Sequence, residues 1–201
     1  MGPKEMVTGV RARARQAMRA EVAAAVQDLV LERGYDETTV DDICATTEIS
    51  RSTFFRYFPS KEDALFGETA DAGEHLRDAL AARPPSETPW VAMRRALDAL
   101  IEEYEGHDER TRRLTRLIVR TPALAARHRE KNARWQELLR PEIARRIGAD
   151  PADDSDPRTH AVIAAALGCV EAALTAWTAS AQPQPLSTIL DRAMGAPTGS
   201  V

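Results

Sequence analysis

The chain has 201 residues, of which 43% are hydrophobic and only 5% aromatic, so it can bury a substantial core as one domain or as two small ones. The abundance of Ala and Leu favours helices over a sandwich of sheets. The net charge of −4 would by itself argue against a nucleic-acid partner.

The distribution of charge argues differently. Residues 1–61 carry nine Lys/Arg and nine Asp/Glu, so the excess of 22 acidic over 18 basic side chains lies in residues 62–201. Five basic side chains fall within residues 1–19, where Glu5 is the single acid. We therefore predict a basic N-terminal arm over residues 1–18, placed before the first helix.

A short capped helix is expected after Thr39. This residue can act as N-cap, and two aspartates follow in the first turn, where the helix dipole favours negative charge. The side chains that repeat at i, i+3, i+4 and i+7 are Val40, Ile43, Cys44 and Thr47. One face of this helix is therefore predicted to be buried.

A second short helix is expected after Ser50, which can serve as its N-cap. Phe54 and Phe58 are four residues apart and share a face, so they would anchor the helix to the domain. At 100° per residue, Ser52 and Arg56 then point outward. The side chains flanking them are Thr53 and Phe55. The spacing of the two helices predicts a helix-turn-helix that enters DNA.

The end of this motif is also basic. Arg51 to Lys61 contains three basic side chains and no acid, and Pro59 and Ser60 stop one helix and begin the next. Lys61 would then lie in a first turn, where a cation is unfavourable unless an anion is near. A DNA phosphate is the expected anion.

At these residues the chain resembles the TetR family of transcriptional regulators. The resemblance runs from about Arg19 to Leu65 and includes the string Thr53-Phe54-Phe55-Arg56-Tyr57-Phe58. It implies an all-α protein with a three-helix DNA-binding head over residues 19–65. Residues 66–201 would form a helical domain that binds a small-molecule effector and dimerises, for about nine helices in all.

The resemblance also implies which residues face DNA. By position they are Thr39, Ser50, Arg51, Ser52, Thr53, Phe55, Tyr57 and Lys61, and the helical geometry adds Arg56. Phe55 departs from the family, which commonly has Tyr there. A phosphate hydrogen bond is thereby lost, and contact with a thymine methyl is favoured.

Beyond Lys61 the pattern predicts only helices, separated by Pro, Gly and Asp. They are expected over residues 60–82, 88–105, 109–120, 121–147, 158–180 and 186–194. The first of them would link the head to the body, and Pro141 would kink or divide the long helix that contains it.

The apolar segment 161–180 has two interpretations. Its small residues could let it cross the core of a monomer, or let two subunits approach closely with Leu167, Leu174 and Trp177 filling the gaps. A homodimer also suits a helix-turn-helix, since two half-sites increase affinity. Cys44 and Cys169 lie far apart on apolar faces and are interpreted as small core residues.

Enzyme motifs are missing from the sequence. It contains no Gly-x-Ser-x-Gly, no phosphate-cradling glycine loop and no Cys-x-x-Cys, and its four histidines show no i, i+4 pairing. We therefore expect no catalytic residue, no cofactor and no metal. No apolar run approaches the ~18 residues of a membrane span, so no membrane contact and a cytoplasmic location are expected.

The predicted function is a ligand-responsive repressor that binds a palindromic operator as a homodimer. A mostly apolar effector would enter between the helices of residues 88–147, and the residues chosen to line its site are Trp90, Met93, Tyr104, Leu117 and Trp135. Ordinary core packing explains each of these separately, since an apolar stripe at helical spacing is usually part of a core. The runs 51–61 and 121–124 also resemble the actinobacterial subgroup that includes mycofactocin-associated regulators, which implies acyl-CoA as effector. A constitutive DNA-organising dimer remains the alternative.

Overall fold

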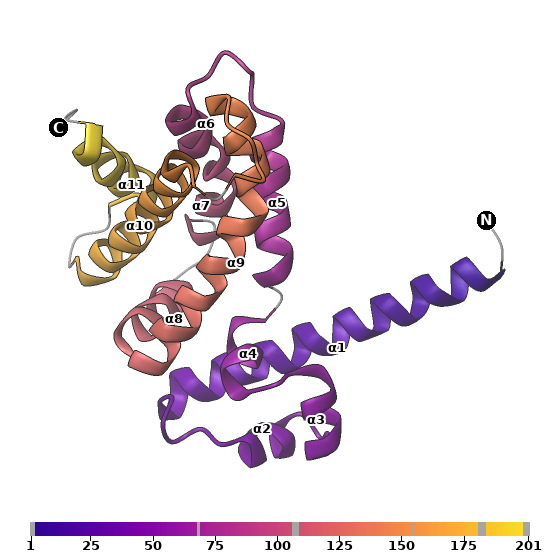
Figure 1. Ribbon diagram of the computed structural model, residues 1–201. Helices are drawn as coiled ribbons and strands as arrows, with labels where there is room; N and C mark the ends of the chain where they lie inside the picture. The colour runs from indigo at the N-terminus through magenta and orange to yellow at the C-terminus, as the bar shows by residue number, and fades with distance from the viewer. Residues whose placement is uncertain (1–2, 68, 106–108, 154, 181–183, 199–201) are drawn as a thin grey trace. The chain divides into compact units, whose positions relative to one another are not determined.

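The computed structural model describes residues 3–67, 69–105, 109–153, 155–180 and 184–198. Within these ranges the chain forms helices and no strand, which confirms the predicted all-α class (Figure 1). The helices divide into two compact units, Met1–Thr69 and Ala70–Val201.

The described residues of the first unit form four helices. They are α1 (Pro3–Arg33), α2 (Val40–Thr46), α3 (Arg51–Tyr57) and α4 (Lys61–Phe66). α1 packs against both α2 and α4, and α2 packs against α3. The side chains without any exposed surface at this core include Val22, Val26, Ile43, Phe54 and Phe58. Burial of these apolar groups holds α3 with one face inward.

The N-terminal segment differs from the expected arm. α1 already begins at Pro3, so the basic residues belong to the helix itself and not to a segment before it. The reason is composition: residues 10–25 contain no Gly or Pro and are rich in Ala and Arg, which are strong helix formers. Arg13 and Arg15 are exposed on this extension.

The turn between α2 and α3 contains a strained residue. Glu48 adopts a φ of 53°, in the left-handed region that side chains other than glycine rarely occupy. The backbone N–H of Ile49 donates to the carbonyl of Cys44 at 3.1 Å and closes the turn. The tight reversal between the two helices therefore depends on an unfavourable conformation at Glu48.

The prediction of a single helix over residues 60–82 is wrong. The chain breaks it at Gly67, so that α4 is followed by a separate α5 (Thr69–Ala81). Gly67 has φ 59° and ψ −136°, a combination that is essentially restricted to glycine. A Cβ added there would also lie 3.3 Å from the Cβ of Ala23. The apolar pattern crosses this break, and an isolated glycine is tolerated inside helices, so the sequence did not reveal it.

The second unit contains α5 and six further α-helices in its described part. They are α6 (Pro89–Ala96), α7 (Asp98–Glu105), α8 (Glu109–Arg120), α9 (Pro122–Ile147), α10 (Pro157–Ala179) and α11 (Leu186–Gly195), and a short 3-10 turn follows at Ala196–Thr198. The expected helix over 88–105 is divided at Leu97. The described ranges therefore hold eleven α-helices instead of about nine, because two predicted helices are each split in two.

α10 is the central helix of the second unit. It packs against α6, α8, α9 and α11, and Figure 1 shows it beside α11. Its inward side chains, which belong to the main core, include Ile163, Ala166, Val170 and Ala173. The expected kink or join at Pro141 does not interrupt α9, which runs through this residue.

Arg146 connects the end of α9 to the end of α5 through hydrogen bonds. Its side chain is only 1% exposed and pairs with Glu142 at 2.7 Å. The guanidinium also donates to the carbonyl oxygens of Leu80, Arg83 and Pro84 at 2.8–3.0 Å. A fully buried guanidinium with this many acceptors fixes how these two helices meet.

Candidate nucleic-acid interface and effector-binding half

Two helix caps position α2 and α3 as predicted. The Oγ1 of Thr39 accepts the Asp42 N–H at 3.2 Å, and the Asp42 carboxylate accepts the Thr39 N–H at 2.9 Å, which completes a capping box. The Thr39 hydroxyl also donates to the Asp42 carboxylate at 2.5 Å, and this bond, together with the one from the Thr39 N–H, holds the pKa of Asp42 below its usual value. Ser50 caps α3 through its Oγ, which accepts the Thr53 N–H at 3.1 Å.

One face of α3 is open to solvent. Phe54 and Phe58 have no exposed surface and anchor the helix, as the sequence predicted. The side chains exposed on the other face are Arg51, Ser52, Phe55 and Arg56. The half-buried side chains at its edges are Thr53 and Tyr57. The structure therefore presents hydroxyl, guanidinium and aromatic groups together on one short helix.

Arg51 is paired but remains available. Its Nη1 lies 2.6 Å from Oδ1 of Asp41 on α2, and the two side chains are 58% and 72% exposed. An ion pair this open to water contributes about 0–1 kcal/mol. A phosphate group can therefore replace Asp41 as the partner of Arg51 at little cost.

Arginines of α1 hold the C-terminal end of α3. Arg19 donates from Nη1 to the carbonyl of Tyr57 at 2.6 Å, and its guanidinium lies 4.8 Å from the ring centroid of Phe58. Arg15 and Arg56 lie 5.8 and 5.2 Å from the ring centroid of Tyr57. A cation at a helix C-terminus is favourable for the dipole. α1 thus fixes the orientation of α3.

The positive charge of Lys61 is stabilised by contacts within the protein. Its Nζ donates to the carbonyl oxygens of Tyr35 and Thr38 at 2.6 and 2.8 Å and lies 3.9 Å from the ring centroid of Tyr35. The hydroxyl of Tyr35 donates to Glu62, and burial together with this bond raises the pKa of Tyr35. The cation in the first turn of α4 is therefore satisfied without the phosphate that the sequence argument required.

The five residues chosen for an effector site lie mostly in the core. Met93 and Trp135 are buried, and Trp90 and Tyr104 are partly buried against the same cluster. The indole N–H of Trp90 donates to the carbonyl of Met194 at 3.3 Å, while Leu117 is half-buried on α8. None of the five is among the residues that line three cavities of the second unit. The choice of these residues stays a prediction.

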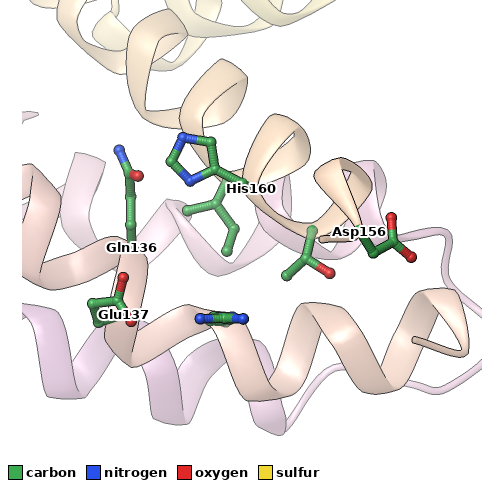
Figure 2. A pocket seen from close by; sticks show the side chains of 7 residues that line it. Gln136, Glu137, Asp156 and His160 are labelled. Carbon is green, nitrogen blue, oxygen red and sulfur yellow. The ribbon is translucent and has the colours of Figure 1, made fainter. Parts of the chain in front are cut away.

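Two of these cavities lie within the second unit and are lined by residues other than the five predicted ones. One, of about 220 Å³, is apolar apart from His75 and is lined by Ala72, His75, Leu76, Ala96, Ala99 and Leu100. The other, of about 440 Å³, lies between α9 and the start of α10 and is lined by Gln136, Glu137, Arg140, Asp156, Thr159, His160 and Ile163. Figure 2 shows Gln136 and Glu137 on one side of it, with His160 and Asp156 on the other helix. The first suits an apolar group and the second a polar one.

Two basic side chains on α9 are shielded from water. Burial, together with the nearby charges of Lys131 and Arg129, lowers the pKa of His128 to about 4. Burial also lowers the pKa of Lys131 to about 8, and its ammonium lies 4.6 Å from the ring centroid of Trp135. His128 is therefore neutral at physiological pH and belongs to the packed interior.

The expectation that no apolar run approaches a membrane span is wrong. α10 contains an 18-residue window with mean hydropathy 1.6, so by length and composition it could cross a membrane. Half of that window is buried inside the protein, and four helices pack against α10, as in the core helix of a folded domain.

Among the residues that the structure describes, no three His, Cys, Asp or Glu side chains are grouped as metal ligands.

Comparison with known proteins identifies both parts of the chain. Residues 22–68 match the family described as bacterial regulatory proteins, tetR family, and residues 87–197 match the MftR C-terminal domain. The HTH-type transcriptional regulator TcmR of Streptomyces glaucescens is 33% identical over 168 residues, which is 81% of this chain and 74% of TcmR. The chain belongs to the TetR family of transcriptional regulators.

Further relatives agree with this assignment. The putative mycofactocin biosynthesis transcriptional regulator MftR of Mycobacterium tuberculosis is 32% identical over 130 residues, 63% of this chain and 64% of that protein. The fold matches the TetR-family repressor FadR of Thermus thermophilus, solved with lauroyl-CoA, with a TM-score of 0.58. That match has 20% identity and covers 91% of this chain and 94% of FadR.

In this TetR-family protein α10 buries three large side chains within its own unit. Leu167, Leu174 and Trp177 are only 4%, 2% and 9% exposed and belong to the core of their own unit. Of the two interpretations of this helix, burial in the core is therefore the one that fits these three side chains. The small residues that face outward include Ala161, Ala165, Gly168 and Ala172.

Sequence reasoning missed two residues that shape the head of the regulator. Arg19 was counted only as basic charge, although it bonds to the last turn of α3. Tyr35 was assigned no role, although its carbonyl accepts a hydrogen bond from Lys61 and its ring lies against the same ammonium. The partners of both residues are more than 20 positions away in sequence, so helical periodicity could not pair them.

Proposed function

We propose that this TetR-family regulator is a repressor that binds a palindromic operator in the cytoplasm as a homodimer and is released by a small, largely apolar effector. The observation that carries the proposal is the open face of α3, where Arg51, Ser52, Phe55 and Arg56 are exposed together. A helix of this size fits the major groove, and such groups hydrogen-bond or pack against base edges and phosphates.

The other residues that are predicted to face DNA suit contacts with its sugar–phosphate backbone. Thr39 and Ser50 are exposed caps, and their hydroxyl groups can donate to a phosphate oxygen in place of the side-chain partners that they have within the caps. Thr53 and Tyr57 lie at the edges of the open face. An ammonium has three N–H donors, and Lys61 uses two on carbonyls, so one can reach a phosphate.

The salt dependence of DNA binding tests this arrangement. Arg56→Ala removes one exposed cation from each α3, so in a dimer the slope of log K against log salt should become less steep by about 1.8. Arg145→Ala is the matched control, because this exposed arginine pairs with Glu142 at the far end of α9. An unchanged slope for Arg56→Ala would contradict the proposed role of α3.

A dimer is proposed through the outward face of α10 together with α11. Ala161, Ala165, Gly168 and Ala172 follow a heptad-like spacing of four, three and four residues, and such small side chains permit close helix approach. A groove of about 590 Å³ between α10 and α11 is lined by Ala172, Ala176 and Ile189 among others. Apolar surface of this kind is typical of an interface.

Sedimentation of charge variants tests the dimer. Ala165→Glu should give folded monomers that bind the operator weakly, because it places a carboxylate on the outward face without touching the core. Ala133→Glu, at an exposed position of α9, should remain dimeric. If the wild type sediments as a monomer at micromolar concentration, the dimer proposal fails.

The effector is proposed to carry an apolar chain. Support comes from the match to the MftR C-terminal domain, from the lauroyl-CoA found in FadR, and from the apolar cavity beside Leu76 and Leu100. An effector that displaces α9 would also move α5, because the Trp135 ring lies directly against Gly73. Release of DNA requires several kcal/mol of preference for the DNA-free state.

Measuring tryptophan fluorescence together with operator release tests whether an effector of this kind regulates DNA binding. Lauroyl-CoA is the first compound, with coenzyme A alone as the control for its polar part. Trp90, Met93, Tyr104, Leu117 and Trp135 are the first positions to vary. A compound that binds this unit and leaves operator affinity unchanged, with no releasing compound found, would favour the alternative of a constitutive DNA-organising dimer.

A further inference from the structure

Phe55 is an unusual side chain for a solvent-facing position. It is 46% exposed, and only Val91, on α6, joins it among the large hydrophobic side chains that the structure shows as exposed. Aromatic rings of this size are normally buried, since they offer a large apolar area and no hydrogen bond. Phe55 lies on the open face of α3 beside Ser52 and Arg56.

The ring of Phe55 is held in a defined place. Its centroid lies 5.3 Å from that of the fully buried Phe54, with the planes at 86°, which is a favourable edge-to-face contact. On the preceding turn, the guanidinium of Arg51 lies 5.8 Å from the ring centroid. A ring positioned by a core residue loses little freedom on binding, so it suits recognition of a specific group.

The chemistry of the major groove limits what a phenyl ring can select there. Base edges offer hydrogen-bond donors and acceptors, which a phenyl ring cannot pair with, and one apolar group, the C5 methyl of thymine. We propose that Phe55 selects thymine at one position of each operator half-site by packing against this methyl. This inference rests on the proposed function, in which α3 enters the major groove.

Burial of one methyl group sets the size of the effect. Removing the methyl should weaken binding about fourfold in one half-site. In a symmetric dimer both half-sites contribute, so the combined loss should be about fifteenfold.

Replacement of thymine by deoxyuridine tests the proposal directly, because the two bases differ only in the methyl. The probe is the duplex that the wild-type protein selects from a random library, with symmetric replacements at one thymine position at a time. For the wild type, one position should show the loss of about fifteenfold. Phe55→Ala should bind the thymine duplex more weakly and should no longer distinguish it from the deoxyuridine duplex.

Two further variants control for side effects. Phe55→Tyr adds a hydroxyl that can donate to a phosphate and draw the ring away from the methyl, so its discrimination should fall below that of the wild type. Val91→Ala removes the other large apolar side chain that the structure shows as exposed and should change nothing. Thermal unfolding shows whether Phe55→Ala remains folded, as expected for an exposed position. If it does not, the wild-type and Phe55→Tyr measurements still decide the matter.

The outcomes separate two failures. Less than a twofold effect at every thymine in the wild type would overturn the role of Phe55 and leave the proposed function intact. The same conclusion follows if discrimination persists in Phe55→Ala, or if the selected half-site contains no thymine. If no duplex is selected at all, the proposed function itself fails.

Discussion

Gly73 of α5 should not tolerate even one added methyl group. A Cβ at this position would lie 2.6 Å from both Cδ1 and Nε1 of Trp135 and 3.1 Å from Cδ1 of Leu138. Trp135 is only 4% exposed, and its ring is rigid, so the indole cannot simply turn away. Gly73→Ala would therefore force α5 and α9 apart or push the ring out of its place.

Two opposing effects decide how much Gly73→Ala changes the free energy of unfolding. Replacing glycine by alanine inside a helix normally stabilises it by about 1 kcal/mol. Overpacking a well-filled core costs about 1–3 kcal/mol, and two contacts at 2.6 Å with a buried ring place this case at the upper end. We therefore expect Gly73→Ala to lower the free energy of unfolding by about 1–2 kcal/mol.

Urea denaturation followed by circular dichroism, at one fixed protein concentration, measures this change. The companion variant Trp135→Phe shortens the ring and makes space beside Gly73. In the double variant the cost of the added methyl should fall by about 1 kcal/mol, since the two residues are in direct contact. If Gly73→Ala is as stable as the wild type or more so, the described packing of α5 on α9 is refuted.

Three other substitutions probe stability by the same denaturation assay. Arg146→Met leaves three carbonyls without this donor and takes from Glu142 one of its two arginine partners, so it should cost about 3 kcal/mol; a loss below about 1 kcal/mol would contradict the described contact between α9 and α5. Glu48→Gly relieves the left-handed turn and should stabilise by up to about 1 kcal/mol, whereas a large loss would show that the turn is not strained. The neutral His128, with its pKa lowered from 6.5 to about 4, favours the folded state at neutral pH. Because the unfolded chain binds the proton first, up to about 3 kcal/mol is lost as pH falls from 6.5 towards 4. His128→Gln should flatten this part of the pH profile, and an unchanged profile would refute its assignment to His128.

The helix-turn-helix was predictable because its signals are local. The caps Thr39 and Ser50 act on residues three positions away, and the pair Phe54 and Phe58 follows directly from helical spacing. These interactions depend on neighbouring residues only. The family string added the positions that face DNA, which remain to be tested.

The helix break at Gly67 and the packing of the second unit could not be predicted, because they depend on tertiary contacts and backbone angles. The small residues of α10 are consistent with either a core or a seam, and only packing against four helices shows that Leu167 faces inward and Gly168 outward. The break at Gly67 depends on its backbone angles. In the same way, Trp90 and Met93 have the same apolar signature whether they line a pocket or fill a core.

Selection of bound sites from a library of random duplexes tests the central claim most directly. The account predicts an inverted repeat whose half-sites are one helical turn apart or a multiple of it, bound more weakly as salt rises. Ser52→Ala, at the centre of the open face of α3, should change which sequence is selected. A library that yields no shared motif, or binding that is insensitive to salt, would contradict the account.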